Sequence, residues 1–144
     1  MDVLPTMSHP FAMECSNDKG TEKHPLLSVV VDDDESVRES LPDLLREFGF
    51  SARTFPSAQE FLSSDCVDQT SSLILDIAMP GMSGPELQQE LKRRGKRIPI
   101  IFITGRRDEN IRAQVFKQGA AGFLLKPFSD AALLAVIQTA LQAN

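Results

Sequence analysis

Three short apolar segments constrain the fold of this chain more than any other feature of the sequence. They cover Leu27–Val31, Ser72–Leu75 and Ile98–Ile103, and Val, Ile and Leu dominate each of them. Segments of this length that are apolar on both sides are typical of strands covered by helices on both faces. The three segments therefore predict an α/β fold around a parallel sheet.

Between these segments, apolar residues recur at the spacing of an α-helix. The clearest case runs from Val37 through Leu41 and Leu45 to Phe48, with Gly49 as a C-terminal stop signal. The expected order is a strand at 27–31, a helix at 37–48, a strand at 52–55, a helix at 57–63, a strand at 72–76, a helix at 84–94, a strand at 98–104, a helix at 110–118, a strand at 122–125 and a helix at 129–142. This repeated βα order indicates parallel strands joined by helical crossovers.

Length and composition fit one folded domain. The chain has 144 residues, of which 42% are hydrophobic and 24% are charged. Residues 1–25 mix Pro, Gly, Ser and charged residues without periodicity, so we expect a flexible N-terminal extension there. Residues 26–144 are predicted to form the domain.

The charge argues against some classes of partner. A net charge of −5 and a pI of about 5.0 disfavour nucleic-acid binding by this segment, because such binding needs a clustered basic face. The basic run at 92–97 falls where a helix is expected to end, and there it complements the helix dipole. Neither a membrane-spanning segment nor a secretory signal is apparent. We expect a cytoplasmic protein without membrane association.

Polar side chains follow the predicted strands at their carboxyl ends. The first strand runs into Asp32 and Asp33, the third ends at Asp76, the fourth ends at Thr104, and the fifth is followed by Lys126. In open α/β sheets, ligands bind outside this edge of the sheet. Each residue alone is weak evidence, but together they predict one site.

The residue types at this edge suit phosphoryl chemistry with a divalent cation. Clustered carboxylates repel one another, and Mg²⁺ relieves the repulsion by accepting oxygen ligands. Asp76 is a candidate nucleophile that would form an aspartyl phosphate. Lys126 and the Thr104 hydroxyl would then neutralise or bind phosphoryl oxygens. We expect Asp34 and Glu35 to serve the first turn of the next helix instead.

Four motifs carry a resemblance to a known family. They are VVVDDDESVRESL, LILDIAMPGMSG, IIFITG and GAAGFLLKPF, spread over about Leu26 to Leu141. This set resembles the response regulator receiver (CheY-like) family, and is closest to its FixJ-type subgroup. The resemblance implies a doubly wound (βα)5 sheet with the flavodoxin-like strand order 2-1-3-4-5. It also implies a cytoplasmic two-component signalling role in transcription regulation, with a sensor histidine kinase as partner.

The resemblance also implies roles for single residues. Asp76 matches the phosphoacceptor of the family. Asp32 and Asp33 match its acidic pair, with Asp33 as a direct Mg²⁺ ligand and Asp32 acting largely through water. The backbone carbonyl of Ala78 matches a further ligand, which leaves the side chain at that position free to vary.

Other matching residues belong to the family's switch. Thr104 and Lys126 match the phosphate-sensing hydroxyl and lysine, and Phe123 matches the switch aromatic, although a phenylalanine in a strand is also a common core residue. The Lys126–Pro127 bond is often cis in the family. The face formed by the fourth helix, fifth strand and fifth helix would respond to phosphorylation and make a homodimer or meet an output domain.

Two features depart from the family pattern, and one alternative function stays open. Pro42 falls inside the first helix, where it removes a hydrogen bond and is expected to cause a kink, and Arg106 is large and charged. The alternative is a receiver fold that binds partners without being phosphorylated, but such modules usually lack an acid, the threonine or the lysine. We expect a phosphoacceptor that assists its own phosphorylation and hydrolysis, and is not otherwise an enzyme.

Overall fold

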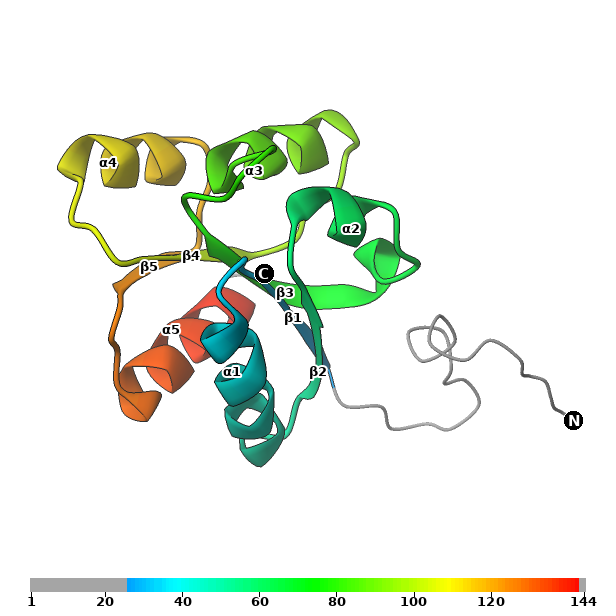
Figure 1. The fold of residues 1–144 in the computed structure, drawn as a ribbon, viewed down its shortest axis with the longest axis vertical. Coiled ribbons are helices and arrows are strands. Elements are labelled where there is room, and N and C mark those ends of the chain that lie inside the picture. Colours follow the sequence, from blue (N-terminus) through cyan, green and yellow to red (C-terminus); the bar gives the residue numbers. More distant parts are fainter. Residues whose placement is uncertain (1–25, 143–144) are drawn as a thin grey trace, which may run out of the picture.

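A computed structural model describes residues 26–142 as a parallel five-stranded sheet between two layers of helices (Figure 1). The elements in chain order are β1 (Leu27–Val31), α1 (Glu35–Glu47), β2 (Ser51–Phe55), α2 (Ala58–Leu62), the 3-10 helix η3 (Val67–Gln69), β3 (Thr70–Asp76), α3 (Gly84–Arg93), β4 (Ile100–Thr104), α4 (Glu109–Lys117), β5 (Gly122–Leu125) and α5 (Asp130–Gln142). The strand order is β2-β1-β3-β4-β5, which confirms the predicted fold class. The predicted N-terminal extension at 1–25 lies outside the described residues.

The strands have different limits from the predicted ones where the sequence signal is weakest. β3 starts at Thr70, two residues early, because Thr70 already pairs with Leu27 of β1. β4 starts at Ile100 rather than at 98, and Pro99 lies just before it. Proline has no amide to donate to a strand ladder, although the Pro99 carbonyl still accepts a hydrogen bond from Leu73 at 2.9 Å.

The alternation of side chains along the strands builds two hydrophobic clusters, one on each face of the sheet. Val29, Val31 and Phe102 pack with residues of α2, α3 and α4 on one face. Val30 and Ile101 pack with residues of α1 and α5 on the other. Full burial of a side chain of this size contributes about 1.5–3 kcal/mol. Burial on both faces explains why the central strands are apolar at successive positions.

The helices α1, α2 and α3 each begin at a residue whose side chain caps the first turn. Asp34 caps α1 by accepting a hydrogen bond from the Ser36 amide, and Ser57 caps α2 by accepting one from the Glu60 amide. Ser83 and Glu86 form a reciprocal capping box at the start of α3. α1 continues as one helix through the buried Pro42. These caps place the connections that follow β1 and β3 near the candidate site.

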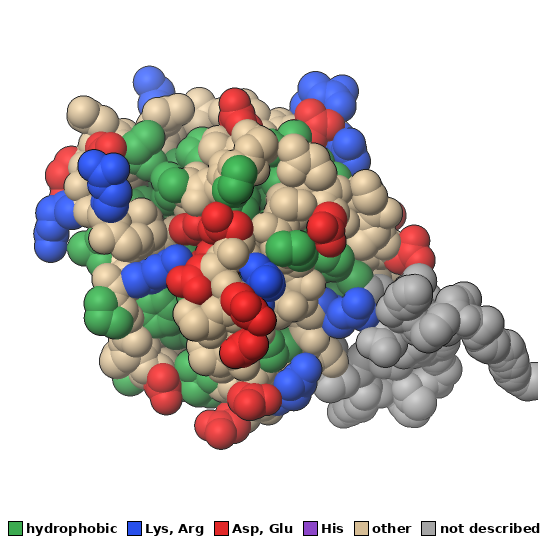
Figure 2. Space-filling view, in the orientation of Figure 1, with side chains coloured by type: hydrophobic (Ala, Val, Ile, Leu, Met, Phe, Trp, Pro, Cys, Tyr) green, Lys and Arg blue, Asp and Glu red, His purple; other side chains and the backbone are tan. Residues whose placement is uncertain are grey.

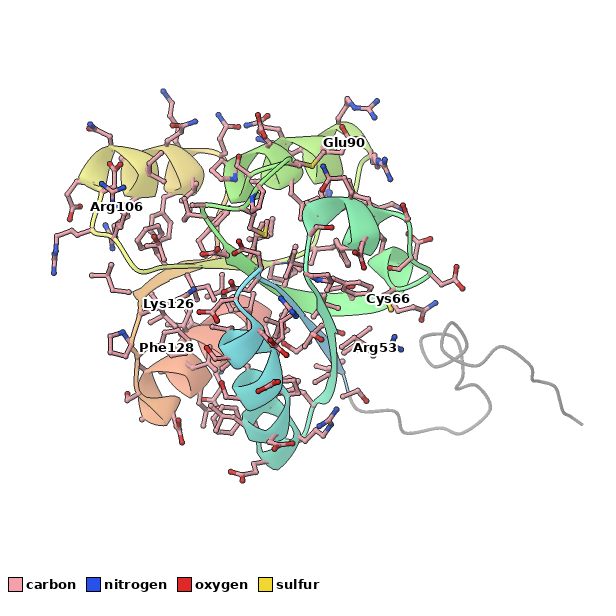
Figure 3. The ribbon with its side chains drawn as sticks, viewed as in Figure 1. Arg53, Cys66, Glu90, Arg106, Lys126 and Phe128 are labelled. Atoms are coloured by element: carbon pink, nitrogen blue, oxygen red, sulfur yellow. The ribbon has the colours of Figure 1, made fainter. Side chains whose placement is uncertain are left out.

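The basic run at 92–97 serves the end of α3 as predicted. Arg93 and Arg94 both pair with Glu90, at 2.5 and 2.7 Å, on the outer side of α3 (Figure 3). These ion pairs lower the pKa of Glu90 to about 2 through hydrogen bonds from the two guanidinium groups. Within residues 26–142, no helix combines the length and the hydrophobicity that crossing a membrane requires.

Candidate functional site

Three carboxylates meet at the carboxyl edge of the sheet. Asp32 follows β1, Asp33 is next to it, and Asp76 ends β3, which is the neighbour of β1 in the sheet. One oxygen of each residue lies within 4.8 Å of the others. Asp32 is fully buried and Asp76 is 6% exposed, whereas Asp33 is open to solvent. Acidic side chains also gather over this part of the surface (Figure 2).

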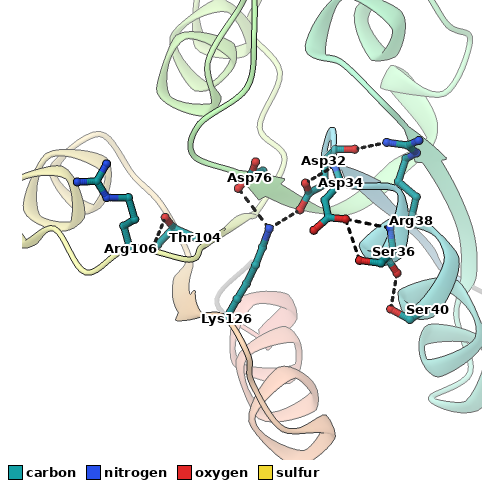
Figure 4. A network of polar contacts seen from close by, with 9 residues as sticks. All are labelled: Asp32, Asp34, Ser36, Arg38, Ser40, Asp76, Thr104, Arg106 and Lys126. Atoms are coloured by element: carbon teal, nitrogen blue, oxygen red, sulfur yellow. Dashed lines mark hydrogen bonds and ion pairs between the residues drawn. The ribbon is translucent and has the colours of Figure 1, made fainter.

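Lys126 reaches into the same cluster from the end of β5. Its Nζ lies 3.0 Å from Oδ2 of Asp32 and 3.7 Å from Oδ1 of Asp76 (Figure 4). Burial alone would lower the pKa of Lys126, but the contacts with Asp32 and Asp76 outweigh it and raise the pKa above its usual value. Lys126 is therefore a permanent cation between the two buried carboxylates.

One ammonium group does not balance three carboxylates. The pKa of Asp76 is raised from 3.8 to about 7, first by burial and then by the charge of Asp32, with Asp33 adding to the effect and Lys126 partly opposing it. Oδ2 of Asp32 is buried and accepts no hydrogen bond of normal geometry, although it forms the ion pair with Lys126. This excess of oxygen ligands fits a hard divalent cation such as Mg²⁺.

Several hydrogen bonds fix the position of Asp32. Its amide donates to the Phe55 carbonyl at 3.1 Å, and its Oδ1 accepts from the Asp34 amide at 2.9 Å. A guanidinium nitrogen of Arg38 donates to the Asp32 carbonyl at 2.9 Å (Figure 4). The sequence predicts no role for Arg38, because nothing in a helical pattern shows that an arginine folds back toward the preceding strand.

Asp34 faces the helix rather than the three carboxylates, as predicted. Its Oδ1 accepts from both the amide and the hydroxyl of Ser36, at 2.9 and 2.8 Å. These hydrogen bonds lower the pKa of Asp34. Glu35 lies in the first turn of α1, where an acidic side chain favours the helix dipole. Four consecutive acids therefore divide into two site residues and two helix residues.

Thr104 ends β4 beside the carboxylates. It is 7% exposed, and its Oγ1 accepts a hydrogen bond from the Arg106 amide at 3.2 Å (Figure 4). The Thr104 carbonyl also accepts from the Lys126 amide at 2.8 Å. The hydroxyl is thus engaged with the connection between β4 and α4, and the main chain of Thr104 helps to position Lys126.

Phe123 is half-buried in β5 and contacts α4. Its ring centre lies 6.4 Å from that of Phe116, and the guanidinium carbon of Arg112 lies 5.0 Å from the Phe116 ring and 5.9 Å from the Phe123 ring. The Lys126–Pro127 peptide bond is cis, as the family resemblance implied. Phe123 therefore contacts both α4 and the hydrophobic cluster on one face of the sheet.

The connection from β3 to α3 passes close to Asp76. Ala78 lies two residues after Asp76 and is exposed. A Cβ atom on Gly84 would lie 2.3 Å from the Asp76 carbonyl oxygen and 3.1 Å from Cα of Ile77. Only glycine fits there. The helical pattern predicts that a helix begins at Gly84 but gives no sign of this close contact.

Comparisons with known proteins identify the family of this chain. The sequence model of the response regulator receiver domain matches residues 29–138. Nodulation protein W of Bradyrhizobium diazoefficiens is 46% identical over 115 residues, which are 80% of this chain and 51% of that protein. The chain spans about half the length of the first curated relatives it matches.

Solved structures of response regulators also match this chain. The response regulator StyR is 47% identical with a TM-score of 0.77, and the match covers 83% of this chain and 61% of that one. FixJ-N is 33% identical with a TM-score of 0.74, and the match covers 86% of this chain and 98% of that one. The chain belongs to the response regulator receiver domain family and is a two-component receiver of the FixJ type.

Proposed function

We propose that this receiver accepts a phosphoryl group on Asp76 from a sensor histidine kinase, with Mg²⁺ held by Asp32, Asp33, Asp76 and the carbonyl of Ala78. One observation carries the proposal. Three carboxylates lie within 4.8 Å of one another, and the Lys126 ammonium contacts two of them. A carboxylate nucleophile, oxygen ligands for a cation and an ammonium group are the parts that phosphoryl transfer requires.

Asp76 needs no separate base, because its carboxylate is itself the nucleophile. One of its oxygens forms the new bond to phosphorus while the bond from phosphorus to the donor nitrogen breaks. Lys126 turns from the carboxylates to a phosphoryl oxygen, as its 3.7 Å distance to Asp76 allows. Mg²⁺, when bound, supplies charge neutralisation for the transferred oxygens.

Thr104 and Phe123 would transmit the phosphorylation of Asp76 to the surface of the domain. The Thr104 hydroxyl leaves the Arg106 amide, which it contacts at 3.2 Å, and donates to a phosphoryl oxygen. Phe123 then moves with β5, and the face formed by α4, β5 and α5 changes. In physical terms, a local charge biases an element with two arrangements. This face would carry a homodimer contact or meet an output partner in the cytoplasm, without contacts to nucleic acid by this segment.

A groove beside the site fits the phosphoryl donor. It has a volume of about 500 Å³ and lies between α1 and the connection from β5 to α5. Its apolar lining includes Val37, Leu44 and Phe128, and acidic residues such as Asp43 and Asp130 also line it. Lys126 belongs to the same lining, so the groove and the carboxylate cluster share this residue. An amphipathic helix of the kinase would dock there.

Intact mass spectrometry tests the proposal. After incubation with acetyl phosphate and Mg²⁺, we expect one phosphoryl adduct, which is lost with a chelator and in Asp76→Asn. Asp65→Asn is the matched control, because Asp65 is exposed and should leave the adduct in place. If neither acetyl phosphate nor purified histidine kinases label the protein, the proposal is wrong and a phosphorylation-independent interaction module becomes the better reading.

A further inference from the structure

Arg38 links the first turns of α1 to the end of β1. It is half-buried in α1, and its guanidinium group donates to the Asp32 carbonyl at 2.9 Å. The pairing of β1 with both β2 and β3 ends at Val31. The Asp32 carbonyl therefore lies just beyond the strand ladders, at the point where the chain leaves the sheet, and Arg38 supplies a hydrogen-bond donor there.

This carbonyl belongs to the peptide unit that joins Asp32 to Asp33. A peptide unit is planar, so a hydrogen bond to its oxygen restrains the orientation of the whole unit and the start of the next residue. The amide and the carboxylate of Asp32 are already held by Phe55, Asp34 and Lys126. Within residues 26–142, no hydrogen bond or ion pair holds the exposed Asp33 side chain.

We infer that Arg38 is a positioning residue for the divalent-cation site: it orients the Asp32–Asp33 peptide so that the two carboxylates face the cation together. Arg38 contacts neither the carboxylate oxygens nor the cation. The inference rests on the proposed function only in requiring that the three carboxylates bind Mg²⁺. It does not require that Asp76 is phosphorylated.

Arg38 could instead act through its charge alone, and this role has the opposite effect on the affinity for Mg²⁺. A guanidinium group near the site repels a divalent cation, so its charge alone would weaken Mg²⁺ binding. Removing a pure source of charge would tighten the binding. Removing a positioning group would loosen it, because Asp33 would have to be ordered during binding. The direction of the change therefore separates the two roles.

Titration calorimetry with Mg²⁺ on the whole chain tests this. Arg38→Met keeps an unbranched stem but removes the donors and the charge, and we expect the Kd for Mg²⁺ to rise about 10-fold, the lower end of the effect of residues that orient metal ligands. Arg46→Met is the matched control. Arg46 lies on the same helix and pairs with the exposed Asp43 at 3.2 Å. The Kd of the Arg46→Met protein for Mg²⁺ should therefore stay within about twofold of the wild-type value.

Arg38→Lys keeps the charge and one donor, so it should recover part of the lost affinity. Circular dichroism and thermal unfolding in chelator establish that each variant is folded. An unchanged or lower Kd in folded Arg38→Met overturns the inference and leaves the proposed function untouched. Wild-type protein that binds no Mg²⁺ at millimolar concentration overturns both. Wild-type protein that binds Mg²⁺ but takes no phosphoryl group overturns the proposed function alone.

Discussion

Asp76 occupies a position where its surroundings disfavour a carboxylate. It is 6% exposed, and Asp32 lies beside it at the same edge of the sheet. Burial and the neighbouring charges raise its pKa to about 7, although Lys126 opposes them. The charged form of Asp76 weakens the fold, but the proposed chemistry needs a carboxylate at this position. The arrangement is a local exchange of stability for reactivity.

Asp76→Asn should therefore stabilise the protein when Mg²⁺ is absent. The substitution removes a buried charge and keeps the shape, so we expect the free energy of unfolding at pH 8 to rise by about 1–2 kcal/mol, with allowance for solvent screening. Urea denaturation in chelator measures this. Asp65→Asn, on the exposed surface, should change it by less than about 0.5 kcal/mol.

The same residue gives this prediction a pH dependence. The folded protein holds the Asp76 proton more tightly than the unfolded chain, because the folded pKa is about 7 against 3.8. The stability that the Asp76 proton contributes is therefore full below pH 3.8, falls as pH rises from there, and is lost above pH 7. The stability difference between Asp76→Asn and the wild type should grow from pH 5 to pH 8, and a constant difference would contradict the assigned burial.

At the scale of elements, contacts with neighbouring elements hold α3 and α4 in place. α3 starts against the end of β3, where Gly84 leaves no room for a Cβ atom beside Asp76. α4 is held at its C-terminal half, where the buried Gln88 donates to the Val115 carbonyl at 3.1 Å. Near the middle of α4, Arg112 covers two aromatic rings. α4, which is part of the face formed by α4, β5 and α5, is therefore tied to α3 through its C-terminal half.

Gly84→Ala should destabilise the domain by about 2–3 kcal/mol. The added Cβ would meet main-chain atoms of Asp76 and Ile77, which cannot move without shifting β3. Gly105→Ala is the control, since a Cβ at Gly105 meets nothing within 4 Å, and its effect should be within about 0.5 kcal/mol. Equal urea midpoints for the two variants would disprove the close contact.

Arg112→Ala should cost about 0.5–1 kcal/mol of stability. The guanidinium group lies over the rings of Phe116 and Phe123, and an exposed cation–π contact contributes about this much. Arg107→Ala is the comparison, because Arg107 forms an exposed ion pair with Glu109 at 3.8 Å, which contributes little. If chemical denaturation gives both variants the same stability, the aromatic contact contributes nothing.

At the scale of the whole molecule, the site joins the ends of strands that lie far apart in the chain. Asp32 follows β1, Asp76 ends β3 and Lys126 follows β5, and β4 separates the last two strands in the sheet. Each strand is anchored by the hydrophobic clusters on both faces. A cation bound at this edge therefore contacts the folded chain and finds no equivalent set of ligands in the unfolded one.

Mg²⁺ should consequently raise the thermal stability of the whole domain. At a concentration ten times the Kd, linkage adds about 1.4 kcal/mol, or a rise in Tm of roughly 4 °C for a domain of this size. Asp33→Asn should remove most of this rise, since Asp33 is a proposed ligand whose exposed side chain should have little effect on folding. Scanning calorimetry with and without Mg²⁺ measures it, and an equal rise in both proteins would exclude Asp33 as a ligand.

Apolar patterning predicts the order of strands and helices along the chain and brings the site residues to one edge of the sheet. Both follow from periodicity and from the rule that parallel strands end on the same side. The role of Asp34 at the start of α1 was also predictable, because a residue there acts on the backbone within three residues of itself. Local signals of this kind are complete in a short stretch of chain.

Contacts that depend on how separate segments approach one another become apparent in the folded chain alone. Examples are the distances from Lys126 to two carboxylates, the hydrogen bond from Arg38 to the end of β1, and the close passage of Gly84 over Asp76. The limits of β3 and β4 moved for the same reason, because strand pairing and a neighbouring proline set them. A contact between distant segments depends on the packing of whole elements, and no single stretch of sequence encodes that packing.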